Sequence, residues 1–219
     1  CIYQPIVCPE DGDFTVTVND VTNIASACVG NSVLFNILDS VTLKPWLNVD
    51  QNGNSLYRYG SGAAHCAPSR YYNFEYSYMT PASRKLAMDF MDSIPNGSIV
   101  VVRSIFYHNN QSLASTWMAD TALYGSNNSL YHKLLGVGFV EIDSISQPRT
   151  WILVYKKGAG SSFIPQYRFG RNFSDKITVS VDVKTPDTLG YITPPVFGPA
   201  KTWKQVKWDG YSLENPSDD

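Results

Sequence analysis

Charged residues are scarce in this sequence, and no basic segment occurs. They make up 16% of the 219 residues, against about 25% in an average soluble domain. The formal net charge is −2, and Lys and Arg form no extended run, although nucleic-acid binding needs a basic patch or stripe. We therefore expect no nucleic-acid partner.

Long apolar segments and a secretory leader are also missing. No stretch of about 18 apolar residues occurs, so we expect no membrane-spanning helix. Residues 1–5 have neither the basic part nor the apolar part of a signal peptide. We expect the chain to be a processed or internal part of a longer exported protein, located outside the cell, at its surface or in the periplasm.

The common catalytic and metal-binding motifs are absent as well. The chain holds three histidines, His65, His108 and His132, and no GxSxG, HExxH or Walker sequence. Segment 50–54 differs from a calcium loop because its glycine stands at the fourth position and its twelfth position is a serine. We expect no enzyme activity, no metal and no cofactor.

Cysteine is limited to four residues, with no CxxC pair that would suggest a zinc ribbon or a thioredoxin motif. For an exported protein we expect two disulfides; of the three pairings that four cysteines allow, we favour Cys1 with Cys8 and Cys28 with Cys66. The alternatives are buried free thiols or a catalytic Cys66 beside His65. Adjacent side chains of an extended segment point to opposite faces, which disfavours a catalytic pair.

Aromatic residues are abundant, at 13% of the chain, with 14 Tyr and 5 Trp. The hydrophobic fraction of 43% is near the globular norm of about 45–50%, which predicts a folded core. With so little charge, the surface must consist largely of Asn, Ser, Thr and Tyr. This composition is typical of exported proteins and of proteins that bind sugars through aromatic platforms; a Tyr-rich β-protein without a ligand is the alternative.

Alternating or continuous apolar runs predict several β-strands. The run from 98 to 105 is rich in β-branched residues, which is typical of a central strand covered on both faces. The glycines at 136 and 138 lead into no helix and are interpreted as a turn. The predicted strands span residues 14–18, 32–38, 74–78, 98–105, 139–142, 150–155 and 177–183.

Two segments predict helices. One begins with Thr80 as N-cap and Pro81 at the first helical position, and it ends before the turn sequence 95–97. The other spans 112–135 and is broken at 124–127. The first helix is expected to bury one apolar face at helical spacing, consisting of Leu86, Phe90, Met91 and Ile94.

These elements predict an α+β (mixed α/β) fold in three parts. Residues 1–31 form an N-terminal β extension with cysteines, residues 32–185 an α/β domain, and residues 186–219 an extended arm rich in Pro and Trp that leads to a further domain. We expect residues 193–208 to dock on the domain as an extended arm, because the prolines keep the backbone extended and the apolar residues are too many for a free linker. N-x-S sequons mark surface loops at Asn96, Asn110, Asn127 and Asn172.

Motifs in the segment 32–158 follow one another in a recognisable order. A strand at 33–39 precedes an aromatic strand, a helix, the sequence Ile-Pro-Asn-Gly and a Val-rich strand, all within 74–102. A helix ending in Leu-Tyr-Gly-Ser at 123–126 comes next, and a Trp strand closed by Lys-Gly at 149–158 completes the order. This order resembles the interleukin-like epithelial–mesenchymal-transition inducer (ILEI) domain, and segment 192–203 is similar to sequences after this domain in large bacterial proteins of the type IX secretion pathway, including sortase-like relatives.

The resemblance implies two small β-sheets flanked by helices and no catalytic residues. Some members of the family are secreted signalling proteins, and one is a sugar-binding stem domain of a glycosyltransferase. Arg149 matches an arginine that precedes the family's tryptophan, whereas Tyr107 and His108 replace the acidic residues and glycine of the family's loop. We expect a binding or scaffolding module whose partners are domains of the same polypeptide and a glycan, with ligand contacts at Arg149, Trp117, Tyr107 and His108; an accessory part of a secreted cysteine peptidase or sortase-like protein is the alternative.

Overall fold

A five-stranded antiparallel sheet is the centre of the fold. Its strands, in spatial order, are β4 (Phe74–Tyr76), β3 (Ser32–Leu38), β5 (Ile99–Ile105), β6 (Trp151–Lys156) and β7 (Gln166–Phe169). A hairpin pairs β1 (Phe14–Val18) with β2 (Val21–Ser26) in a separate sheet. This computed structural model describes residues 14–19, 21–26, 32–48, 72–105, 113–172 and 175–183.

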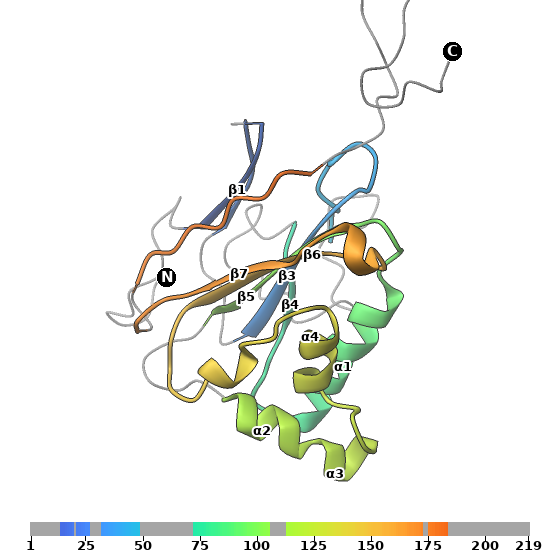
Figure 1. Cartoon of the computed structure of the whole chain (residues 1–219), viewed down its shortest axis with the longest axis vertical. Helices are drawn as coiled ribbons and strands as arrows, with labels where there is room; N and C mark the ends of the chain where they lie inside the picture. The colour runs from blue at the N-terminus through green and yellow to red at the C-terminus, as the bar shows by residue number, and fades with distance from the viewer. Residues whose placement is uncertain are drawn as a thin grey trace, which may run out of the picture. The chain divides into compact units, whose positions relative to one another are not determined.

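Helices accompany the sheet, which confirms the predicted mixed α+β fold class. Figure 1 shows α1 to α4 gathered on one side of the five-stranded sheet, with β1 and the extended segment 175–183 on the other side. The chain divides into two units, Cys1–Pro186 and Asp187–Asp219, and every described residue belongs to the first. The helical elements are α1 (Pro81–Ser93), α2 (Ala114–Ala119), α3 (Thr121–Tyr124), α4 (Leu130–Gly136), η3 (Ile142–Ser144) and η4 (Gly160–Ser162).

Helix α1 begins and ends as predicted. The Thr80 hydroxyl accepts a hydrogen bond from the Ser83 N–H at 3.2 Å, and Pro81 takes the first turn, where its missing N–H costs nothing. Gly97, with φ of 89°, makes the turn into β5. The prediction for Leu86 is wrong: it lies one position outside the buried stripe and is 58% exposed, whereas Arg84 is buried.

Strand β5 is covered on both faces, as predicted. Val100 and Val102 pack toward α1, α2 and α4 in the larger apolar cluster. Ile99 and Val101 face the opposite side, in a second cluster with Leu38 and Val154. Because successive side chains of a strand alternate between faces, a continuous β-branched run satisfies both layers.

The segment 177–183 is extended but is not a strand of either sheet. Its side chains do alternate between half-buried and exposed, as the sequence pattern predicts. The half-buried Val179, Val181 and Val183 pack against the second apolar cluster. The predicted strand is therefore corrected to an extended segment that covers the sheet without joining a ladder.

The predicted strand at 139–142 is wrong. These residues form a turn and the start of η3, because Gly138 adopts a φ of 97° immediately before them. Phe139 and Ile142 are fully buried while Val140 is 65% exposed, so the buried residues are three positions apart, as in a 3-10 turn, rather than two, as in a strand.

Strands β2 and β7 were not predicted from the sequence. The arm 186–219, the loop 50–54 and Asn110 lie outside the described residues.

Candidate functional site

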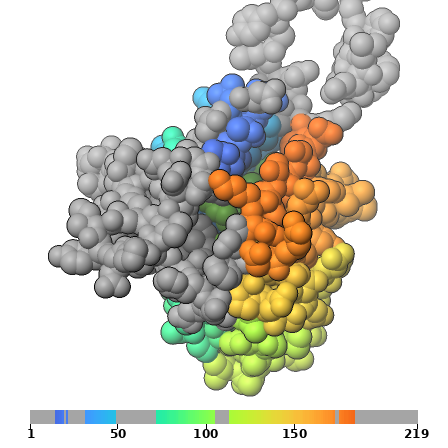
Figure 2. All heavy atoms as spheres, turned by 90° about the vertical axis from the view of Figure 1, so that its left-hand side faces the viewer, coloured from blue at the N-terminus to red at the C-terminus, as the bar shows by residue number. Residues whose placement is uncertain are grey.

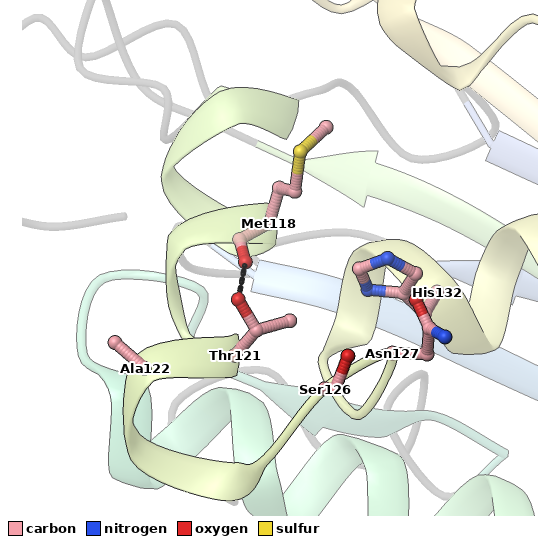
Figure 3. Close-up of a pocket in the computed structure, with 6 residues that line it drawn as sticks. All are labelled: Met118, Thr121, Ala122, Ser126, Asn127 and His132. Atoms are coloured by element: carbon pink, nitrogen blue, oxygen red, sulfur yellow. Dashed lines mark hydrogen bonds between the residues drawn. The ribbon is translucent and has the colours of Figure 1, made fainter.

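A shallow cleft lies between the helices α2 and α3 and the beginning of α4. Its volume is about 470 Å³. Figure 3 shows Ser126, Asn127 and His132 on one side of the cleft and Met118, Thr121 and Ala122 on the other. The cleft is lined by Met118, Thr121, Ala122, Ser126, Asn127 and His132.

The loop between α3 and α4 is shaped by two residues with positive φ. Gly125 has a φ of 96° and Asn127 a φ of 57°, a region that glycine and asparagine tolerate best. Asn128 closes the loop, since its N–H donates to the Gly125 carbonyl at 3.1 Å and its amide to the Tyr124 carbonyl at 2.8 Å. Ser126 and Asn127 are consequently exposed at the rim of the cleft.

His132 is oriented by the residue that caps its own helix. Ser129 is the N-cap of α4; its hydroxyl accepts from the His132 N–H and lies 2.8 Å from His132 Nδ1. Because Ser129 is fully buried, its hydroxyl has no solvent acceptor, and it donates its hydrogen to His132 Nδ1. Because Ser129 contacts Nδ1, Nε2 is the imidazole nitrogen that can form a hydrogen bond with a ligand in the cleft.

Helix α4 is also tied to η3 through the neighbour of His132. The Tyr131 hydroxyl donates to Asp143 at 3.0 Å, and the Tyr131 and His132 rings meet edge to face with centroids 5.1 Å apart. Burial, together with this hydrogen bond, raises the pKa of Tyr131. The phenol therefore stays protonated and holds this side of the cleft in place.

The opposite wall is anchored by a buried ion pair. Arg84 of α1 donates from Nε and Nη2 to the two carboxylate oxygens of Asp120, at 2.6 and 2.7 Å. The Arg84 Nη1 also donates to the Tyr78 carbonyl. Asp120 stands at the junction of α2 and α3, so this planar, two-point contact fixes both short helices against α1.

The cleft offers polar side chains that can form hydrogen bonds with a ligand. Ser129 and His132 have the spacing of a nucleophile and its base, but the serine is fully buried and serves as a helix cap. In the part of the chain that the structure describes, no three His, Cys, Asp or Glu side chains could together hold a metal ion. The lining residues offer neutral hydrogen-bond donors and acceptors beside the apolar Met118 and Ala122.

Of the sequence-predicted contacts, the two that the structure describes do not line this cleft. Trp117 is completely buried and packs edge to face against Trp151, with ring centroids 6.2 Å apart, so it presents no surface to a ligand and is withdrawn as a contact. Arg149 is half-buried over the Phe169 ring, 5.7 Å from its centre, and does not line the cleft. Tyr107 and His108 lie outside the described residues, as do Cys1, Cys8, Cys28 and Cys66.

Sequence analysis did not select Ser126, Asn127 or His132. Two signals pointed to their neighbourhood, namely the predicted helix break at 124–127 and the sequon at Asn127. The exposed position of Asn127 agrees with the surface location expected for sequons, and Asn96 and Asn172 are exposed too.

Comparisons with protein-family models, with curated proteins and with solved structures find no match for this chain. The resemblance to the ILEI domain therefore stays a prediction. No helix among the described residues has the length and apolar character needed to cross a membrane.

Proposed function

We propose that this chain is a non-catalytic binding module of a larger exported protein and that its cleft binds a saccharide. The observation that carries the proposal is the lining of the cleft, which combines the polar residues Ser126, Asn127 and His132 with Met118, Thr121 and Ala122 of α2 and α3. Sugars combine hydroxyl groups with apolar C–H faces. A volume of about 470 Å³ lies within the range of about 300–1,000 Å³ that is usual for small-ligand sites.

The charge of the lining supports a neutral ligand. None of the six residues is a Lys, Arg, Asp or Glu. A charged ligand would lose hydration on entering the cleft without gaining a partner of opposite charge. Hydrogen-bonding side chains without charge fit hydroxyl and acetamido groups, and the shallow shape predicts weak, reversible binding.

A glycan array followed by calorimetry tests this proposal. The whole chain is expected to bind a subset of neutral glycans. Ser126→Ala and Asn127→Gly are each expected to weaken binding about two- to tenfold, because one ligand hydrogen bond is worth about 0.5–1.5 kcal/mol. Glycine is chosen at 127 because it accepts the positive φ without strain.

Leu123→Ala is the matched control. Leu123 lies on α3, is 64% exposed and does not line the cleft, so its truncation should leave affinity unchanged. Failure to bind any glycan would contradict the proposal. So would a double variant of Ser126 and Asn127 that binds as tightly as the unaltered chain.

A further inference from the structure

The four methionines of the chain differ sharply in exposure. Met88 and Met91 belong to the buried residues of α1 and are 1% and 2% exposed, whereas Met79 and Met118 are 44% and 38% exposed. An oxidant dissolved in water reaches a thioether most readily where the side chain lies at the surface. Two of the four methionines are therefore accessible in the folded chain.

Met118 lies at the surface on a fixed backbone. Trp117, the residue before it in α2, is completely buried in the core. The Thr121 hydroxyl donates to the Met118 carbonyl at 2.9 Å, as the dashed line in Figure 3 marks, and the Met118 thioether extends outward from α2. Figure 2 shows α2 and α3, in light green, as part of the molecular surface. The position of Met118 is thus defined while its side chain stays exposed.

Of the two exposed methionines, only Met118 lines the cleft between α2, α3 and α4. Its thioether is the largest apolar group of the lining, beside the small Ala122. Met79 precedes α1 and does not line the cleft. A chemical change at Met118 therefore alters the surface that a ligand meets, and the same change at Met79 does not.

We propose that Met118 is an oxidative modification site that sets the affinity of the cleft for its ligand. The oxidant is hydrogen peroxide: a sulfur lone pair attacks one peroxide oxygen, the O–O bond breaks and an S=O bond forms. Sulfur gives up two electrons, and the second oxygen leaves as water with both peroxide hydrogens. The product, methionine sulfoxide, is polar and can be reduced back enzymatically. The effect on affinity rests on the proposed saccharide site, whereas the modification itself does not.

Oxidation replaces an apolar wall of the cleft with a strong hydrogen-bond acceptor. Water hydrates this acceptor, and the apolar C–H face of a sugar must displace that water to pack against it. The loss of about one methylene-sized apolar contact lowers affinity about fourfold. Because the sulfoxide is reducible, the change in affinity is reversible.

Peroxide treatment of the folded chain, followed by mass spectrometry of its peptides, tests the modification. Met79 and Met118 should be oxidised first, and the buried Met88 and Met91, as internal controls, only after unfolding. NMR spectra of the oxidised chain without ligand should show changed amide shifts near 118–132. Resistance of Met118 equal to that of Met88, or unchanged spectra after its full oxidation, would overturn the proposal without reference to any sugar.

Saccharide affinity before and after peroxide tests the consequence. The unaltered chain should bind about fourfold more weakly after treatment and recover after enzymatic reduction. Met118→Leu has no sulfur at this position and should show the same affinity before and after treatment, whereas Met79→Leu should respond like the unaltered chain. An equal loss in Met118→Leu would overturn the role of Met118. If the untreated chain binds no sugar, the saccharide site is contradicted, and the oxidation and NMR results still decide whether Met118 is the modified residue of the cleft.

Discussion

Arg84 and Asp120 illustrate how much one pair of side chains contributes to the position of the cleft. The two side chains are only 2% and 4% exposed, so each is the buried counter-charge of the other. We predict that Asp120→Ala lowers the free energy of unfolding by about 3–5 kcal/mol, because it leaves a buried guanidinium without its counter-charge. Urea denaturation followed by circular dichroism measures this change.

The exposed pair of Lys133 with Asp92 is the comparison for this prediction. It also joins two helices, with contacts of 2.7 Å, but its side chains are 31% and 55% exposed. Lys133→Ala should cost less than about 1 kcal/mol, since surface ion pairs contribute little. Equal effects of the two substitutions would show that burial does not govern the strength of the Arg84 contact.

At the scale of single elements, the turn between α4 and η3 rests on Gly138. Its φ is 97°, and a Cβ placed there would lie 2.6 Å from Pro165 Cγ. We predict that Gly138→Ala lowers the free energy of unfolding by about 1–3 kcal/mol, through backbone strain and displacement of Pro165. Thermal unfolding monitored by tryptophan fluorescence would report the change, because Trp117 and Trp151 lie in the adjacent core.

Gly136, two residues earlier, is the matched control for Gly138. It lies in the last turn of α4, and a Cβ there would meet nothing within 4 Å. Gly136→Ala should be neutral or stabilise the protein by up to about 1 kcal/mol, because alanine favours helix. If both substitutions had the same effect, the specific role of the positive φ and of Pro165 would be refuted.

Elements with strong local signals were predictable from the sequence. Helix α1 carries its own N-cap and proline, and β5 its β-branched run, so the type of each element can be recognised from its own residues. The strand expected at 139–142 failed because burial of Phe139 and Ile142 comes from a turn set by Gly138. The short strand β7 was missed because its four residues are too few to give a clear pattern, and they form a strand only by pairing with β6.

At the scale of the whole molecule, the site was less predictable than the fold. Ser126, Asn127 and His132 are close in sequence, but the other wall of the cleft is formed by α2 and α3, which the Arg84–Asp120 contact holds against α1. That contact joins residues 36 positions apart, which no local pattern reveals. Trp117 was selected as an aromatic ligand contact, although burial against Trp151 makes it part of the core.

The proposed export of the protein predicts that its cysteines are oxidised. The denatured protein should show no titratable thiol before reduction and four afterwards, since the chain has four cysteines. Thiol titration with and without reductant measures this directly. A reactive thiol at Cys66 with a lowered pKa would instead favour the cysteine peptidase alternative.

Binding of a saccharide at the cleft is tested most directly by an NMR titration of the isotope-labelled chain with neutral hexoses and N-acetylhexosamines. The predicted result is a saturable change in amide chemical shifts confined to residues near 118–132, and its loss in the double variant of Ser126→Ala and Asn127→Gly. Shifts that are absent at millimolar sugar, or that appear only elsewhere, for example around Arg149 and Phe169, would contradict a saccharide site between α2 and α4.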